Sequence, residues 1–150
     1  MSQQQSTPPP KPTPIPQQDN EFYWEKAKAH ELWLRKCSDC NEVYFYPRDI
    51  SPCCFSRNTE WIKASGKGTL YTWGITVRPP TPAFREDAPF VLAIVDLEEG
   101  CRIPTNLVGI PKDPDPEKMA AHITHGMAVE VAFEDRTDAI SVPVFKPVDS

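Results

Sequence analysis

The stretch from Lys36 to Ser56, KCSDCNEVYFYPRDISPCCFS, holds four of the five cysteines of this chain and constrains its fold more than any other. Cys37 and Cys40 form a Cys-x-x-Cys turn, in which the backbone doubles back so that two thiolates can converge on one ion. Cys53 and Cys54 follow after a twelve-residue arm. Two such pairs on opposite arms can complete a tetrahedral Cys₄ site. The sequence therefore predicts a zinc ribbon.

The second half of this site is irregular. Ser51-Pro52-Cys53-Cys54 resembles a Cys-Pro-x-Cys turn in which Ser51 has replaced the first cysteine. Adjacent side chains of an extended chain point apart, so Cys53 and Cys54 share an ion only if the chain turns between them, and Pro52 favours a turn.

We expect a Zn²⁺ ion held by all four clustered cysteines. Three alternatives remain open: three thiolates completed by water or by Ser51, a ribbon without metal, and a disulfide between the adjacent cysteines. An open fourth position would suit a catalytic zinc, but no acid–base partner lies nearby in the sequence. A structural zinc is therefore favoured.

Charge and composition exclude several classes of protein. Sixteen basic and twenty-one acidic side chains give a net charge of −5, which argues against nucleic-acid binding through phosphate neutralisation. No apolar run approaches the ~20 residues that span a bilayer, and the first residues lack the features of a secretory signal. Clustered cysteines in odd number fit metal binding in a reducing compartment. We expect a cytoplasmic protein that is not associated with a membrane.

Residues 1–18 are predicted to be a disordered tail. Six prolines fall between Pro8 and Pro16, which favours an extended, polyproline-like conformation. Such a tail is a possible ligand for an aromatic groove, although solvation alone explains its composition. Residues 19–59 are predicted to form a helix and the zinc ribbon, and residues 60–150 a β-barrel.

A capping residue at position 19 or 20 is predicted to begin a short helix that runs to about residue 30. Phe22, Tyr23 and Trp24 are consecutive, so one face of this helix cannot bury all three. Two interpretations remain open: the surplus aromatic side chains form a partner-binding surface, or they cover the ribbon and the barrel.

The second part of the chain has the order of an OB-fold, a small five-stranded barrel with three strands, a helix and two strands. Glycines at positions 66 and 68 permit a bend before the first strand, and Pro104 places its strand at an edge or a bulge. The predicted elements are strands at 71–77, 90–97 and 102–110, a helix that starts at 115 and is closed by Gly126, and strands at 129–134 and 140–145.

At this point the chain resembles a known family, the acyl-CoA-associated OB-fold proteins with an N-terminal rubredoxin-like zinc ribbon. The resemblance extends from about residue 21 to residue 147. The matching segments, in order, are FYWE (22–25), CSDC (37–40), YPRDISPCCFS (46–56), EWIKASGKGTLYTW (60–73), PFVLAIVDLEEGCRIPTNLVG (89–109), GMAVEVAFED (126–135) and PVFKP (143–147). This chain departs from the family pattern at Ser51, which stands where the third cysteine is expected, and at Phe55, where the family often has glycine.

The resemblance implies a non-catalytic accessory subunit. Proteins similar to this one assemble with thiolase-like enzymes or with aldolases that shorten steroid side chains, and there the ribbon and barrel act as a scaffold. The resemblance thus implies a hetero-oligomer with a thiolase-like catalytic subunit, with acyl-CoA at the shared interface, and with the catalytic residues on the partner.

The residues themselves agree with this expectation, since the sequence contains no nucleophile elbow, phosphate-binding glycine loop or HExxH motif. Lys63, Lys67 and Arg78 lie near the first barrel strand and are candidates to meet the phosphates of CoA, although solvated surface charge is the simpler interpretation. Two other classes stay open: a single-stranded nucleic-acid-binding protein, and an independent zinc enzyme.

Overall fold

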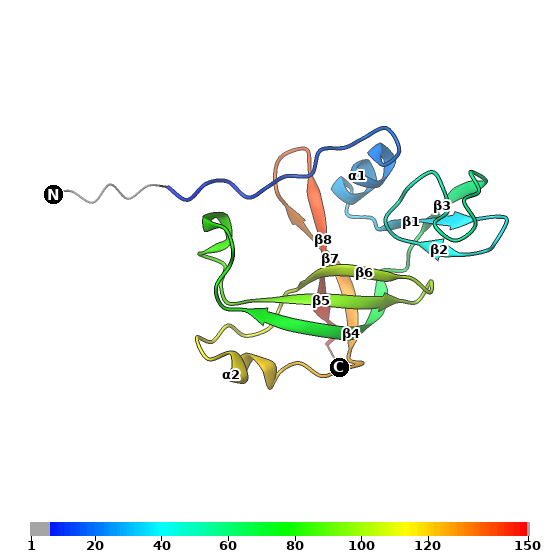
Figure 1. Cartoon of the computed structure of the whole chain (residues 1–150). Coiled ribbons are helices and arrows are strands. Elements are labelled where there is room, and N and C mark those ends of the chain that lie inside the picture. The colour runs from blue at the N-terminus through cyan, green and yellow to red at the C-terminus, as the bar shows by residue number, and fades with distance from the viewer. Residues whose placement is uncertain (1–6, 150) are drawn as a thin grey trace.

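The computed structural model describes residues 7–149 and consists mainly of β-structure. It confirms the predicted fold class: a helix and a small ribbon sheet precede a closed five-stranded barrel (Figure 1). The elements are α1 (Glu21–Lys28), β1 (Trp33–Cys37), β2 (Val43–Tyr44), β3 (Thr59–Lys63), β4 (Lys67–Thr76), the 3₁₀ turn η1 (Pro82–Phe84), β5 (Phe90–Leu97), β6 (Arg102–Leu107), α2 (Pro116–Ala120), β7 (Ala128–Asp135) and β8 (Ser141–Pro147).

The ribbon is a three-stranded antiparallel sheet with the order β2-β1-β3. Strand β1 lies in the centre and pairs with β3 over its whole length, from Trp33 opposite Lys63 to Cys37 opposite Thr59. The boundary that the sequence suggested between residues 59 and 60 falls inside β3. Because β2 has only two residues, the far side of the ribbon consists mostly of irregular chain.

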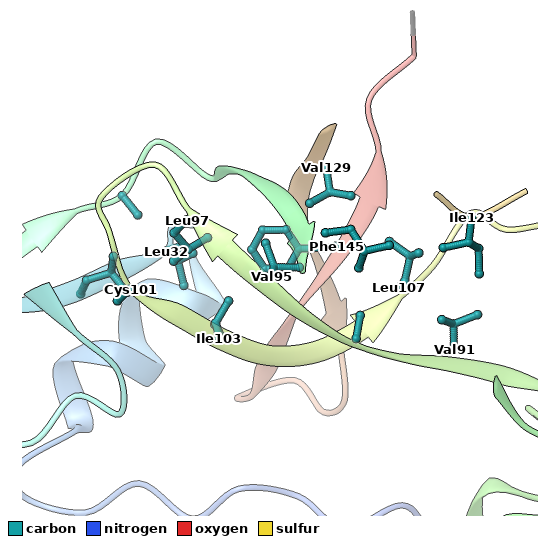
Figure 2. Close-up of a cluster of buried hydrophobic side chains, with 14 of the residues drawn as sticks. Leu32, Val91, Val95, Leu97, Cys101, Ile103, Leu107, Ile123, Val129 and Phe145 are labelled. Atoms are coloured by element: carbon teal, nitrogen blue, oxygen red, sulfur yellow. The ribbon is translucent and has the colours of Figure 1, made fainter. Parts of the chain in front are cut away.

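The barrel closes in the order β4-β5-β6-β8-β7, with β4 paired to both β5 and β7. Strand β5 has the predicted bounds and alternates in burial, with Val91, Ala93, Val95 and Leu97 directed to the core. Closure pairs strand edges that would otherwise be exposed. Phe145 of β8 is fully buried at the centre of this core (Figure 2).

Pro104 lies at a position of β6 where the absence of a backbone N–H costs few strand-to-strand hydrogen bonds. Strand β6 pairs with β5 throughout, and Pro104 stands opposite Ile94. On its other side β6 pairs with β8 only at Leu107, opposite Phe145. The proline therefore lies at a nearly free strand edge, as the sequence suggested.

The helix α2 is shorter than predicted. Asp115 caps it by accepting a hydrogen bond from the Glu117 N–H at 3.0 Å, but the helix ends at Ala120 and does not reach Gly126. The next turn is tighter, because the Ile123 N–H donates to the Ala120 carbonyl at 3.0 Å. Buried Met119 and Ile123 hold this segment to the barrel.

One hydrophobic cluster joins the ribbon to the barrel. Helix α1 packs between β8 and β1 (Figure 1). Tyr23 and Leu32 belong to the same buried cluster as Leu97, Cys101 and the rest of the barrel core. Figure 2 shows Leu32 at one end of this cluster, beside Leu97 and Cys101. The two modules therefore share a core.

The described part of the N-terminal tail, residues 7–18, contains no helix or strand; residues 1–6 lie outside the described chain. The tail contacts the barrel through Lys11, whose Nζ lies 2.6 Å from a carboxylate oxygen of Asp87. No helix within residues 7–149 is long and apolar enough to cross a membrane.

The register at the barrel closure depends on Gly68, which pairs with Leu97 on one side and Val129 on the other. A Cβ at this position would lie 2.5 Å from the Asp96 carbonyl oxygen. We expect Gly68→Ala to lower the free energy of unfolding by roughly 1–3 kcal/mol through overpacking. The measurement is urea denaturation followed by circular dichroism.

Gly74→Ala is the matched control, because Gly74 lies on the same strand and a Cβ there meets no atom within 4 Å. Equal stability of the two variants would show that the closure at Gly68 is not tightly packed.

Candidate metal centre

The first chain reversal of the ribbon begins at Cys37, the last residue of β1. The chain turns through Ser38 and Asp39 to Cys40, and Asn41 then adopts a left-handed conformation with φ 60°. The Cys37 N–H donates to the Glu42 carbonyl at 2.9 Å and closes the turn. This reversal directs the thiols of Cys37 and Cys40 to the same side.

The second chain reversal begins at Ser51 and ends at Phe55. The Ser51 N–H donates to the Ser56 carbonyl at 2.9 Å, and the Phe55 N–H donates to the Ser51 carbonyl at 3.0 Å. Phe55 has φ 61°, which is uncommon for an aromatic residue. The turn that Pro52 favoured is therefore present.

The two reversals bring three thiols together. The Sγ atoms of Cys37, Cys40 and Cys54 all lie within 4.8 Å of one another, and those of Cys37 and Cys54 are 3.6 Å apart. A tetrahedral site with Zn–S bonds of about 2.3 Å has S···S edges of about 3.8 Å. The spacing and the donor type of this group therefore fit a tetrahedral metal ion.

Two further side chains border this group. The Ser51 hydroxyl is fully buried and its Oγ lies 3.6 Å from Cys40 Sγ. Cys53 is exposed and is not part of the group of three, although its thiol interacts with Cys40 and this interaction raises the pKa of Cys53. Of the four cysteines that the sequence proposed as ligands, the structure gathers three.

Hydrogen bonds and burial shift the pKa values of the thiols in this group in different directions. A backbone hydrogen bond from Glu42 and a hydrogen bond from Ser51 lower the pKa of Cys40 to about 7. At Cys54 a backbone hydrogen bond from Ser56 lowers the pKa, but desolvation and the neighbouring thiols outweigh it and the pKa is raised. Three adjacent thiolates repel one another, so a divalent cation would favour the deprotonated state that ligation needs.

Polar contacts tie the two reversals to each other outside the thiols. Asp39 accepts hydrogen bonds from the Ser56 hydroxyl and, at 3.1 Å, from the Asn58 amide, and both contacts lower the pKa of Asp39. The Ser38 N–H also donates to the Asn58 carbonyl at 2.9 Å. These exposed bonds hold the arms in register around the thiols.

The three consecutive aromatic residues of α1 pack against the ribbon and the core. Phe22 lies with its ring centroid 5.2 Å from that of Trp33 and 4.9 Å from that of Trp61. Tyr23 is only 3% exposed, and its burial raises its pKa above the usual range. Trp24 is half-buried against Tyr23, at 5.0 Å. Only Phe22 and Trp24 retain surface that a partner could contact.

The three cations proposed for CoA phosphates do not converge. Lys63 lies on β3 and forms an ion pair with Glu31 at 3.2 Å. Lys67 opens β4 and Arg78 lies beyond its other end, which is at Thr76, so the length of the strand separates the two. These side chains are distributed over the surface and do not form a single phosphate site.

A groove that the sequence analysis missed lies on the outer face of the barrel. It has a volume of about 540 Å³ and no charged residue in its lining. Tyr46 and Leu92 border it and are 58% and 50% exposed, and Trp73, Ile94 and Pro104 also line it. The sequence signal for this groove was Leu92, an apolar residue that faces outward from β5. Because β5 is nearly all apolar, its sequence did not reveal which residues face outward and which face the core.

Comparison with known proteins assigns the two modules. Residues 24–60 match the family described as the ChsH2 rubredoxin-like zinc ribbon domain, and residues 61–134 match the ChsH2 C-terminal OB-fold domain. A DUF35 domain-containing scaffold protein of Methanocaldococcus jannaschii is 39% identical over 123 residues, which are 77% of this chain and 80% of that protein. The chain belongs to this ChsH2-type, DUF35 family of a zinc ribbon joined to an OB-fold, and the resemblance seen in the sequence is confirmed.

Two further relatives carry names that refer to enzymes. A chain in the solved structure of the Ltp2-ChsH2(DUF35) aldolase is 35% identical with a TM-score of 0.73, and the match covers 89% of this chain and 98% of that one. A probable enoyl-CoA hydratase alpha subunit of Thermomonospora curvata is 34% identical over 137 residues. Those residues are 91% of this chain but only 40% of the hydratase subunit.

We expect metal to bind stoichiometrically through the group of three thiols. Cys40→Ala should abolish retention of the ion, and it should lower the stability of the protein, because binding to the folded state alone adds about 2.7 kcal/mol at a hundred times the Kd. The measurement is metal content by mass spectrometry together with the Tm, which should fall by roughly 5–10 °C.

Cys101→Ala is the control for this experiment. Cys101 is buried in the barrel, where desolvation raises its pKa to about 11, and it lies outside the group of three thiols. Its replacement should leave the metal content unchanged. Metal loss in both variants would contradict the assignment of the site.

Proposed function

We propose that this chain is a non-catalytic, zinc-stabilised accessory subunit of an acyl-CoA-processing complex of the thiolase or aldolase type, needed for the assembly or activity of its catalytic partner. The observation that carries the proposal is the match to nearly the whole of one chain of the Ltp2-ChsH2(DUF35) aldolase at 35% identity. The scaffold proteins at 39% and 38% identity support it further.

The metal in this proposal is a structural Zn²⁺ ion held by Cys37, Cys40 and Cys54. When bound, zinc would neutralise thiolates that otherwise repel one another, and it would link the two chain reversals. The ribbon needs such a link, because β2 contributes only two residues and, apart from Cys37 at the end of β1, both reversals lie outside the sheet. Clustered thiols also favour a reducing compartment, which is why we place the protein in the cytoplasm.

The partner in this proposal is a thiolase-like or aldolase-type catalytic subunit that docks on the uncharged groove of the barrel. Large apolar side chains exposed together on a rigid sheet are typical of interfaces. Tyr46 connects this groove to a second cavity of about 400 Å³, which is lined by Trp24 and Phe45 among others. The side of α1 that carries Trp24 is thus continuous with the groove, and Trp24 would extend the interface. Phe22, in contrast, lines neither cavity and packs against Trp33 and Trp61.

The acyl-CoA ester in this proposal is bound chiefly by the catalytic subunit. Lys63, Lys67 and Arg78 are too dispersed to hold the phosphates of one CoA molecule together, and Lys63 is already paired with Glu31. An apolar groove is better suited to contact protein or an acyl chain than a phosphate group. The accessory subunit then contributes shape to the shared interface.

We expect Leu92→Glu to abolish complex formation, because it places a charge in the apolar groove where docking would remove it from water. The test is co-expression with thiolase-type and aldolase-type proteins encoded in the same genome, followed by size-exclusion chromatography and metal analysis. The unmodified chain should co-elute with one of them, and the variant should elute alone with its zinc retained.

Val77→Glu provides the control, because Val77 is 48% exposed and lies beyond the end of β4, outside the groove. It should leave the complex intact. Loss of the complex in both variants would move the interface away from the groove, and failure of the unmodified chain to bind any of these enzymes would refute the proposed function.

A further inference from the structure

We propose that the Ser51 hydroxyl, and not the Cys53 thiol, is the fourth donor of the metal site, so that this chain binds its ion through three thiolates and one oxygen. This inference deepens the proposed function and rests on its zinc ion. It follows from the serine at the start of the second reversal.

The backbone makes Ser51 the structural equivalent of Cys37. Each residue opens a reversal whose last ligand lies three positions later, Cys40 in one case and Cys54 in the other. The Cys37 N–H donates to the carbonyl five residues ahead, and the Ser51 N–H does the same, both at 2.9 Å.

The equivalence continues through both turns. The residues that follow the last ligands, Asn41 and Phe55, have φ of 60° and 61°. The next residue along the chain gives a backbone hydrogen bond to the last thiol in each reversal, Glu42 to Cys40 and Ser56 to Cys54. The site is therefore a pseudo-symmetric pair of turns, and Ser51 occupies the first ligand position of the second turn.

Burial and distance agree with this placement. The side chains of Cys37 and Ser51 are both 0% exposed. Two contacts between donor atoms of opposite reversals, Cys37 Sγ to Cys54 Sγ and Cys40 Sγ to Ser51 Oγ, are both 3.6 Å. A tetrahedron with bonds of about 2.3 Å to sulfur and about 2.0 Å to oxygen has an S···O edge of about 3.5 Å.

The same equivalence sets Cys53 apart from the ligands. Cys53 corresponds to Asp39, the third residue of the first reversal, and both side chains are exposed. The Cys53 N–H donates to Ser51 Oγ at 3.3 Å, so the backbone of Cys53 orients the hydroxyl while its thiol stays outside the group. A second turn built like the first leaves its third residue facing solvent.

An oxygen donor changes the properties of the site. Three thiolates and Zn²⁺ carry a net charge of −1, whereas four thiolates would leave −2. A neutral hydroxyl is a harder and weaker donor than a thiolate for zinc. The donor at this position of the tetrahedron should therefore dissociate from the ion more readily. The site should therefore hold zinc less tightly than a Cys₄ ribbon and release it faster to a chelator.

The experiment compares the unmodified chain with Ser51→Cys, Ser51→Ala and Cys53→Ser, each loaded with Zn²⁺ or with Co²⁺. Chelator competition measures affinity and release rate, and the thiolate-to-cobalt charge-transfer absorption measures the number of thiolates. Ser51→Cys should bind zinc more tightly and release it more slowly, because a thiolate is a stronger donor to zinc than a hydroxyl. It should also increase the charge-transfer band by about one third, from three thiolates to four. Ser51→Ala should release zinc faster, and Cys53→Ser should match the unmodified chain in all three readouts.

Two results would overturn the inference and leave the proposed zinc subunit intact. One is a weaker charge-transfer band and weaker zinc binding in Cys53→Ser, which would make Cys53 the fourth ligand. The other is unchanged binding in Ser51→Ala and in Ser51→Cys, which would exclude position 51. If neither the unmodified chain nor any variant binds Zn²⁺ or Co²⁺, the inference is refuted, and so is the zinc ion of the proposed function.

Discussion

The convergence of two chain reversals on one small group of thiols is the constraint on which the ribbon depends. The sheet beneath it is short, and its edge strand β2 has only two residues. Exposed hydrogen bonds around Asp39 align the arms, but water competes for the donors and acceptors of such bonds and weakens their net contribution. In the proposed function, a metal ion that links β1 to the loop carrying Cys54 would add the stability that so small a sheet cannot supply.

The ribbon and the barrel share one hydrophobic core. Tyr23 and Leu32 pack into the same cluster as the barrel residues around Phe145. The residues that border the apolar groove come from both parts, Tyr46 from the ribbon and Leu92 from the barrel. A well-ordered ribbon therefore helps to shape the surface proposed for the partner. In this way the metal site is connected to the proposed function.

Much of this architecture could be predicted from the sequence, because local patterns determine it. The bounds of β5 follow from its apolar run, the edge position of Pro104 follows from its missing N–H, and the turn at Ser51 follows from Pro52. The end of α2 could not be predicted, because tertiary contacts of Met119 and Ile123 tighten the chain there before Gly126.

The details of the site were harder to predict. The sequence names four nearby cysteines, but only the three-dimensional equivalence of the two reversals separates Cys54 from its neighbour Cys53. The groove around Leu92 was hidden for a similar reason, since an apolar strand does not reveal which of its faces is covered by the rest of the fold. In both cases the information that the sequence lacks is the direction in which a side chain points.

The central claim is that a bound ion orders the two reversals, whereas the barrel is stabilised by its own packing without the ion. Hydrogen exchange of the full chain, measured before and after removal of the metal, tests it most directly. The account predicts that removal strongly accelerates exchange of the amides of Cys37 and Ser51, which close the two turns, and leaves the amides of β5 protected. Unchanged protection at Cys37 and Ser51 after the metal is gone would contradict it.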